Sequence, residues 1–179
     1  MDRMWKKAST TLYSDIFLGI WFKKTMKRKK FTFLDPDPLT DGDLEVTLDR
    51  KIPPNYRRGY APVYQFKMLR ADTGDIMGTI DLRVGNTEDL VKYSGHFGYR
   101  VTVEYRGNRY AARSLKLLLP LARTHGLNPV WVTCDPDNSA SRRTCEIVGG
   151  QLIDIVDVPQ NTDLYKRGEQ RKCRYRFDL

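Results

Sequence analysis

The sequence has few histidines and cysteines and no long run of apolar residues. Only two histidines and three cysteines occur among its 179 residues, and Cys134, Cys145 and Cys173 show neither CxxC nor Cys/His spacing. Because this pattern fits reduced thiols better than disulfides or a zinc site, we predict no bound metal and a cytoplasmic location. The longest apolar run is 16–22. It is far shorter than the roughly 20 residues that a membrane-spanning helix needs.

The composition is that of a soluble globular protein, and the positive charge is concentrated at one end. Hydrophobic residues make up 40% and charged residues 30% of a chain long enough for one full core. The net charge is +9, and residues 1–30 hold nine basic and two acidic residues, a net +7. Binding to nucleic acid or to an anionic surface is therefore an expectation for residues 1–30 and not for the rest.

Residues 1–34 are predicted to form a basic extension that contains an amphipathic helix. Apolar residues recur at helical spacing between Ser9 and Lys29. Such a stripe favours packing against the chain's own domain or a second subunit, which makes a homodimer plausible. Binding to an anionic membrane or to nucleic acid is the alternative. The stripe consists of Trp5, Leu12, Tyr13, Ile16, Phe17, Ile20 and Trp21.

Residues 43–179 are predicted to form the folded domain. The Asp-Pro and Asp-Gly pairs of 34–43 indicate a turn-rich connector before it. Alternating apolar and polar residues predict strands at 43–52, 63–70 and 75–85, the last two joined as a hairpin. In the third strand we expect one face to carry Ile76, Gly78, Ile80, Leu82 and Val84. Two more strands are expected near the C-terminus, QLIDIVDVP and KCRYRFDL.

Residues 95–150 read as strand, turn, long helix, buried strand and second helix. The strand HFGYRV leads into EYRGNRYA, which opens a helix, and PVWVTCD precedes a second helix that begins near DNSAS. Polar residues gather at both junctions between a strand and a helix. This stretch is therefore where we expect the chemistry of the protein.

The first junction has the features of a phosphate-binding turn. The first N–H groups of a helix have no intrahelical partner, and the helix dipole favours negative charge beside them. Gly107 would allow the tight turn, and Arg106 and Arg109 would add charge that pairs with phosphate oxygens. The alternative is an ordinary corner between a strand and a helix. The backbone N–H groups expected to face the anion belong to Asn108, Arg109, Tyr110 and Ala111.

The two junctions together resemble the GNAT N-acetyltransferase superfamily. EYRGNRYA is similar to the EYRGxGxA signature of that superfamily, and DNSAS resembles its second motif, 32 residues after Arg106. The resemblance is close over 95–150 and loose over 43–179, and it points to a branch of predicted bacterial acetyltransferases. It implies an α+β fold whose mixed, mostly antiparallel central sheet is splayed between two strands and flanked by helices.

The resemblance also implies a function and a site. Acetyl-CoA, or another acyl-CoA, would be the co-substrate, and its acetyl group would pass directly to a primary amine of a small molecule or peptide. The pantetheine arm would lie along Val101 to Val103, and the pyrophosphate would lie at 107–111. Asn138 and Ser141 would approach the arm from the second helix.

Two residues depart from the pattern of the superfamily. Arg109 replaces its second glycine, and Cys145 stands where many relatives carry a tyrosine that protonates the leaving thiolate. Cys145 shares a helical face with Ala140 and Val148, so we interpret it as a buried core residue. A catalytically silent module that binds or senses acyl-CoA is therefore an alternative function. Binding of nucleic acid or an anionic surface through residues 1–30 is another.

His96 is the predicted general base. It begins the strand beside the expected splay, and the reference pKa of histidine is near neutrality. A packed or hydrogen-bonding histidine is the alternative interpretation. Glu104 is a weaker candidate that we expect to face solvent, and Asp81 and Arg83 are possible contacts for the acceptor.

Overall fold

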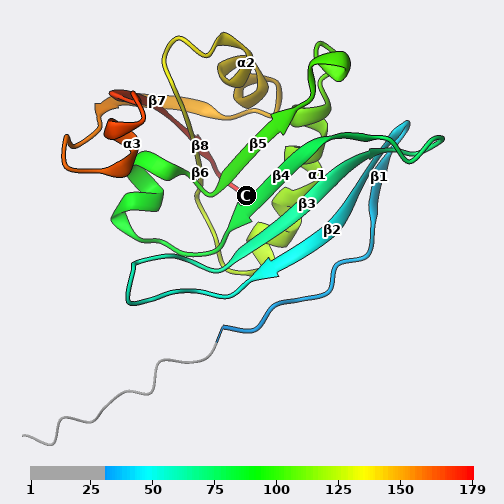
Figure 1. Ribbon diagram of the computed structural model, residues 1–179, viewed down its shortest axis with the longest axis horizontal. Coiled ribbons are helices and arrows are strands. Elements are labelled where there is room, and N and C mark those ends of the chain that lie inside the picture. The colour runs from blue at the N-terminus through cyan, green and yellow to red at the C-terminus, as the bar shows by residue number, and fades with distance from the viewer. Residues whose placement is uncertain (1–30) are drawn as a thin grey trace, which may run out of the picture. The chain divides into compact units, whose positions relative to one another are not determined.

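An antiparallel meander of five strands forms the first half of the structure, a computed structural model that describes residues 31–179 (Figure 1). Each strand pairs with the next in sequence, as the alternating pattern of apolar residues predicts. A two-residue turn at Gly42 and Asp43 joins the first two strands. The strands are β1 (Leu39–Asp41), β2 (Leu44–Ile52), β3 (Val63–Arg70), β4 (Ile76–Arg83) and β5 (Phe97–Val101).

The sheet continues across β5 into three further strands and opens at that point. The added strands are β6 (Val130–Cys134), β7 (Gln151–Asp157) and β8 (Arg171–Phe177), in the order β1-β2-β3-β4-β5-β6-β8-β7. β5 and β6 are parallel and share one partner pair, Phe97 with Val132. Beyond that pair the two strands separate, so the mixed, mostly antiparallel splayed sheet is confirmed.

Two helices follow the predicted junctions, and three short helical segments lie in connectors. α1 (Tyr110–Thr124) packs on β4 and β5, and α2 (Ser139–Ile147) lies beside α1 and β6 (Figure 1). No helix among residues 31–179 is long and apolar enough to span a membrane. The short segments, which we did not predict, are the π-helix η1 (Leu90–Ser94), the 3₁₀-helix η2 (Val103–Tyr105) and α3 (Asp163–Lys166).

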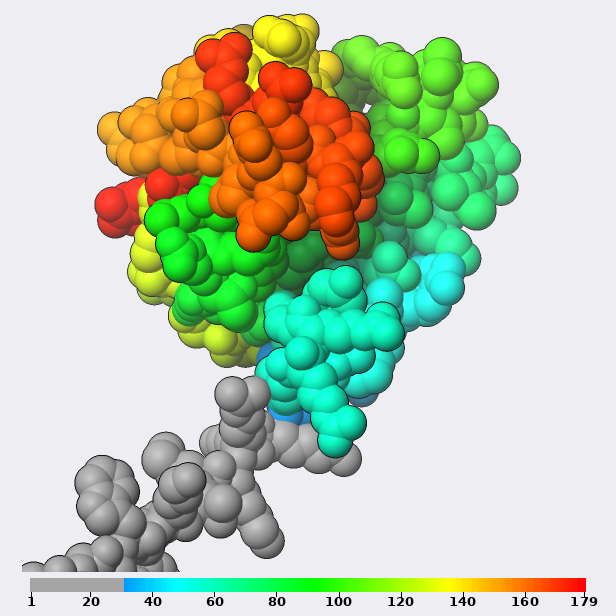
Figure 2. Space-filling view, turned by 60° about the vertical axis from the view of Figure 1, so that its left-hand side comes forward, coloured from blue at the N-terminus to red at the C-terminus, as the bar shows by residue number. Residues whose placement is uncertain are grey.

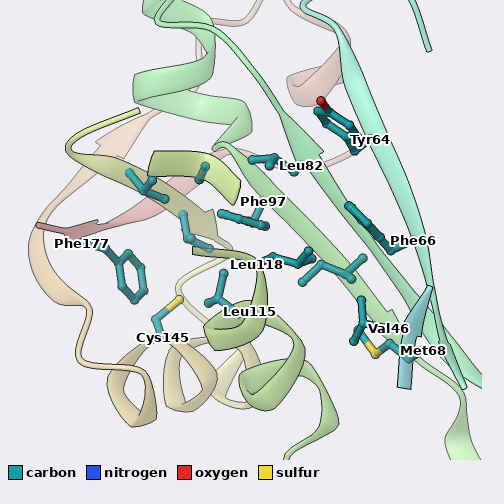
Figure 3. Packing of buried hydrophobic residues seen from close by; sticks show 14 of the residues in the cluster. Val46, Tyr64, Phe66, Met68, Leu82, Phe97, Leu115, Leu118, Cys145 and Phe177 are labelled. Atoms are coloured by element: carbon teal, nitrogen blue, oxygen red, sulfur yellow. The ribbon is translucent and has the colours of Figure 1, made fainter. Parts of the chain in front are cut away.

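The core lies between α1 and the sheet. Leu115 and Leu118 of α1 are fully buried in one cluster with Ile80 and Leu82 of β4 (Figure 3). Complete burial of each leucine contributes about 1.5–3 kcal/mol to folding. This packing holds the N-terminus of α1 at a fixed place beside β5.

The predicted alternation of β4 is confirmed at its centre and wrong at its start. A β-bulge opposite Met68 shifts the register, so Met77 is buried and Ile76 is exposed. At Gly78 a side chain would not fit, because a Cβ atom would lie 2.2 Å from the carbonyl oxygen of Arg100 on β5. Glycine therefore allows β4 and β5 to pair closely.

The folded unit begins earlier than the predicted residue 43. The ring of Phe33 packs edge-on against Tyr64 at 4.9 Å, and the Leu34 N–H donates to the Tyr64 hydroxyl at 2.6 Å. β1 then adds a strand to the sheet. Residues 31–43 therefore belong to the folded unit, because Phe33 packs against β3 and β1 pairs with β2. The predicted amphipathic helix between Ser9 and Lys29 lies outside the described residues.

Candidate functional site

A cleft of about 600 Å³ lies between β5, the N-terminus of α1 and α2, and we call it the helix cleft. It brings together residues that are far apart in the sequence, from both predicted junctions. Ala111, Ala112, Ala140 and Ile147 give it an apolar wall. Of the predicted cofactor-binding residues, its lining includes Val101, Arg106, Gly107, Arg109, Tyr110, Ala111, Asn138 and Ser141.

The turn before α1 has an unusual backbone. Gly107 has φ +86°, and Arg109, the N-cap of α1, has φ +60° in the left-handed region. A residue other than glycine in this region costs about 1 kcal/mol, which explains why the resembled signature has its second glycine at this position. The side chain of Arg109 makes no capping bond. The first N–H groups of α1 therefore remain available to an anion.

Four arginines line the helix cleft, and no acidic residue does. Arg106 and Arg109 come from the turn, Arg100 from β5 and Arg143 from α2. Arg106 also donates from Nε to the Val101 carbonyl at 3.2 Å, which ties the turn to the end of β5. The sequence analysis missed Arg100 and Arg143; the adjacent arginines of SASRR were the available signal. The cleft thus has the charge expected of a site for a polyanion.

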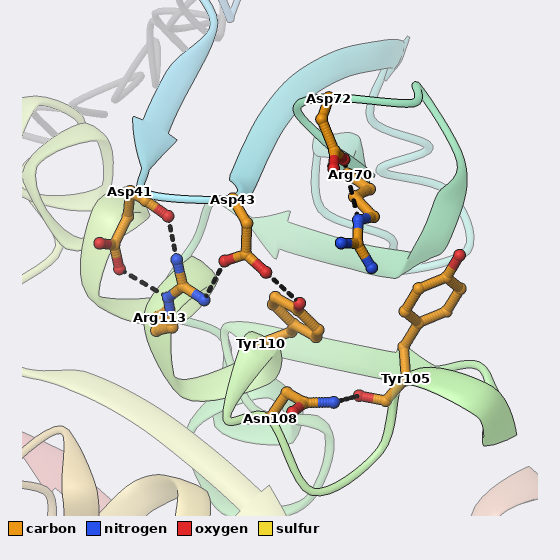
Figure 4. Close-up of polar contacts among 8 residues, drawn as sticks. All are labelled: Asp41, Asp43, Arg70, Asp72, Tyr105, Asn108, Tyr110 and Arg113. Atoms are coloured by element: carbon orange, nitrogen blue, oxygen red, sulfur yellow. Dashed lines mark hydrogen bonds and ion pairs between the residues drawn. The ribbon is translucent and has the colours of Figure 1, made fainter.

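Two predicted residues do not line the helix cleft. Val103 lies in η2 and is 68% exposed. The Asn108 side-chain amide donates to the Tyr105 carbonyl at 3.2 Å and so braces the turn (Figure 4). Glu104 is exposed on η2, as expected.

The N-terminus of α1 is held by polar contacts with the turn between β1 and β2. The Tyr110 hydroxyl donates to Asp43, and Arg113 pairs with Asp41 at 2.8 Å and with Asp43 at 2.7 Å (Figure 4). The hydrogen bond from Tyr110, followed by that from Arg113, lowers the pKa of the Asp43 carboxyl. About 70 residues separate these partners in sequence, so no local pattern could indicate them.

The start of α2 lies against Tyr99 of β5, which lines the helix cleft. The Asn138 side chain caps α2 by accepting from the Ser141 N–H at 2.9 Å. The Ser141 hydroxyl lies 2.8 Å from the Tyr99 hydroxyl, which lies 3.8 Å from the Cys145 sulfur. Burial raises the pKa of Tyr99, so its hydroxyl keeps its proton. The sequence analysis did not identify Tyr99.

Cys145 belongs to the core and does not line the cleft. Its side chain is fully buried in the hydrophobic cluster, near Leu115 (Figure 3). Burial raises the pKa of its thiol to about 12. The interpretation of Cys145 as a core residue is confirmed.

The structure contradicts the prediction that His96 is the general base. His96 is fully buried, its Nε2–H donates to the Gly85 carbonyl at 2.8 Å, and its Nδ1 accepts from the Trp131 N–H at 2.8 Å. Burial lowers its pKa. Neither nitrogen is free to take a proton from a substrate, so His96 is a structural link between β5 and β6.

A second cleft, of about 760 Å³, lies between the start of β5, the loop that joins β2 to β3 and the region of α3, and we call it the loop cleft. Figure 2 shows the hollow between the loop that joins β2 to β3 and the region of α3. Its lining includes Phe97 and Gly98 of β5, whereas Tyr99 lines the helix cleft. The two clefts are thus bordered by neighbouring residues of β5, next to the point where β5 leaves β6. Arg83 lines the loop cleft and Asp81 does not.

No metal site is evident in residues 31–179, where no three His, Cys, Asp or Glu side chains are grouped to hold an ion. The three cysteines are buried free thiols.

Comparison with protein families finds a match to the family described as Acetyltransferase (GNAT) domain over residues 13–151, more than half of the chain. The match begins within the predicted N-terminal extension. Comparison with curated proteins finds no match.

Solved structures of acetyltransferases share the fold. The ribosomal-protein-S5-alanine acetyltransferase of Vibrio fischeri superposes with a TM-score of 0.60 at 12% identity, over 80% of this chain and 97% of that one. A ribosomal L7/L12 alpha-N-protein acetyltransferase in complex with coenzyme A superposes with a TM-score of 0.51 at 17% identity, over 69% of this chain and 65% of that one.

Proposed function

Since the chain belongs to the GNAT acetyltransferase domain family and is therefore an acyltransferase, we propose that it transfers an acetyl group from acetyl-CoA to a primary amine. The observation that carries this proposal is the helix cleft. It combines a helix N-terminus with unpaired N–H groups, four arginines and an apolar wall, and it shares β5 with the loop cleft beside the splay.

Each part of the helix cleft suits one part of acetyl-CoA. The N–H groups at 107–112, with Arg106 and Arg109, would bind the pyrophosphate. The apolar wall would bind the pantetheine arm, which would run toward Tyr99 along the open edge of β5. The acetyl group would then lie at the seam between the two clefts, with the amine in the loop cleft.

Transfer needs a proton for the leaving thiolate, and Tyr99 is placed to supply it. The ammonium group first loses one proton to water, and the neutral nitrogen then bonds to the acetyl carbon. The nitrogen loses a second proton to water as the carbon–sulfur bond breaks, which leaves the amide. The sulfur leaves with the electron pair and takes the proton of the Tyr99 hydroxyl, which is then restored from solvent. Tyr99 would thus act as the general acid in place of Cys145, whose thiol is fully buried and does not line the helix cleft.

The acceptor would be a small molecule or a peptide amine, and the enzyme would work in the cytoplasm. Buried free thiols fit a reducing compartment. The two structural neighbours are named for acetylation of ribosomal proteins, which keeps a peptide amine among the candidates.

Two measurements test the proposal. Isothermal titration should show one acetyl-CoA per chain, and a thiol-detecting reagent should record release of CoA with members of a panel of primary amines. Absence of binding would overturn the proposal.

A second candidate is a silent acyl-CoA-binding module, favoured by the buried Cys145 and by the arginine in the left-handed region at 109. Binding of acetyl-CoA without thiol release from any amine would support it. The third alternative, binding of nucleic acid or an anionic surface, depends on residues 1–30, outside the described residues.

A further inference from the structure

The loop cleft carries an excess of positive charge. Its lining includes Arg58, Arg83, Arg167 and Lys172, against Asp89 and Glu169. Both acids already have partners in the protein. Glu169 pairs with Lys172 and lies 3.6 Å from Arg167, and Asp89 accepts from the Ser94 hydroxyl at 2.7 Å.

Arg83 is the cation of the loop cleft that packs against β5, whereas the more buried Lys172 already pairs with Glu169. Its side chain is 29% exposed, and it packs against Gly98, where a Cβ atom would lie 2.9 Å from Nη2. The absence of a side chain at Gly98 therefore leaves room for the guanidinium next to β5. Gly98 directly precedes Tyr99, so Arg83 lies close to the seam where the acetyl group would be.

The protein satisfies the Arg83 guanidinium poorly. Nη1 lies 3.4 Å from the carbonyl oxygens of Ser94 and Gly95, and Nη2 lies 3.9 Å from Asp81. Charge-assisted hydrogen bonds are normally 2.7–2.9 Å long. A guanidinium has five N–H donors, so several remain for a ligand.

We propose that Arg83 binds a carboxylate of the acceptor, so that the substrate is a small amine with a carboxylate a few bonds from its nitrogen, as in an amino acid. This inference rests on the proposed function. The planar fork of a guanidinium matches a carboxylate with two parallel hydrogen bonds. Binding would give a partly buried cation the close counter-charge that it lacks in the protein.

The position of Arg83 also limits the length of the substrate. The carboxylate would sit beside Gly98, and the amine must reach the thioester at the level of Tyr99, the next residue of β5. A long spacer between amine and carboxylate would therefore move one of the two groups out of place. Short amino acids satisfy both positions.

The test compares matched pairs of amines with acetyl-CoA as donor. Each free amino acid is paired with its neutral carboxamide, and 2-aminoethyl phosphate is added as an amine with a different oxyanion. We expect kcat/KM for the free acids to exceed that of the carboxamides at least about tenfold, the scale of one charged hydrogen-bond pair. Arg83→Met should abolish this difference, and Arg83→Lys should restore part of it. Arg50→Met is the control, since Arg50 is 72% exposed on β2, outside both clefts.

The comparison within the wild-type protein remains decisive if the Arg83 variants do not fold. Equal rates on acids and carboxamides, a preference for carboxamides or for peptides with blocked C-termini, or a higher rate on the phosphate than on the carboxylates would each overturn the inference. Absence of transfer to any member of the panel would overturn it too. If no amine is acetylated but calorimetry still shows acetyl-CoA binding, the helix cleft remains an acyl-CoA site and only the acceptor inference fails. If acetyl-CoA does not bind either, the proposed function fails as well.

Discussion

The two clefts that border β5 are built from different parts of the polypeptide. The helix cleft is formed by two short stretches, 99–112 and 138–147, and offers backbone N–H groups, arginines and small side chains. The loop cleft is formed by side chains from segments spread between Ile52 and Lys172. A site made largely of backbone and local turns leaves a motif in the sequence, whereas a site assembled from distant side chains does not. The donor is therefore easier to infer than the acceptor.

The largest effect is expected from a substitution that weakens acetyl-CoA binding in the helix cleft and leaves the loop cleft unchanged. Gly107→Asp places a carboxylate beside the proposed pyrophosphate seat, and we expect the Kd for acetyl-CoA to rise at least about 100-fold through repulsion between like charges. Calorimetry measures it. Asp tolerates positive φ better than most residues, and nothing lies within 4 Å of a Cβ atom at this position, so the fold should survive. Gly107→Asn is the matched control without charge, and an unchanged Kd in the aspartate variant would remove the assigned seat.

The next prediction concerns chemistry at the seam. Tyr99→Phe keeps the ring and removes the proton donor, so kcat should fall about 100-fold while the Kd for acetyl-CoA stays within about twofold. Steady-state kinetics and calorimetry separate the two effects. Tyr105→Phe is the control, because Tyr105 also lines the helix cleft but its hydroxyl contacts Asp75. An undiminished kcat would show that the thiolate obtains its proton elsewhere.

A third prediction concerns His96, the structural link between β5 and β6. Replacing His96 with Asn leaves the buried partners at Gly85 and Trp131 poorly satisfied, so the free energy of unfolding should fall by about 1–3 kcal/mol at pH 7.5. Because burial lowers the pKa of His96, its contribution is present above the unfolded value near 6.5 and is lost as pH falls below it. Denaturant unfolding between pH 7.5 and 5 should therefore show a shallower acid loss in the variant.

His125 also has a pKa lowered by burial and remains in that variant, so some acid sensitivity should persist. Identical pH dependence in the wild-type protein and the variant would contradict the assigned state of His96.

The smallest expected effect concerns the turn itself. Arg109→Ala and Arg109→Gly both remove one charge, so each should weaken acetyl-CoA binding only about threefold to tenfold. Only glycine adopts the left-handed conformation of residue 109 without strain. The free energy of unfolding of the glycine variant should therefore be about 1 kcal/mol higher than that of the alanine variant. Thermal unfolding of the two proteins checks this order. The reverse order would mean that residue 109 is not held at positive φ.

The long elements and the helix cleft were predictable, because periodicity and turn chemistry are local. The strands of β3 and β4, the helix after Gly107 and the cap at Asn138 all follow from neighbouring residues. The bulge that exposes Ile76 was not predictable, since it depends on pairing with β3. His96 was misassigned for a related reason. Its sequence position beside the splay was right, but its two hydrogen-bond partners come from distant loops and strands.

Tyr99 and Arg83 show the same limit at the level of function. Tyr99 lies in a strand that gives no catalytic signal, and the contact that led us to propose a role for it is with Ser141, 42 residues away. Arg83 was identified as a possible acceptor contact, but its long hydrogen bonds to Ser94 and Gly95 and its place beside Gly98 are visible only in the folded chain. Three-dimensional contacts were needed to give either residue a specific task.

Amide hydrogen exchange with and without acetyl-CoA tests the central claim most directly. If the N–H groups after the turn bind the pyrophosphate, acetyl-CoA should slow exchange in 107–112 and 138–144, while the loop at 53–61 of the loop cleft should change little. Slowed exchange at that loop together with unchanged exchange at 107–112 would contradict the assignment of the helix cleft to the donor.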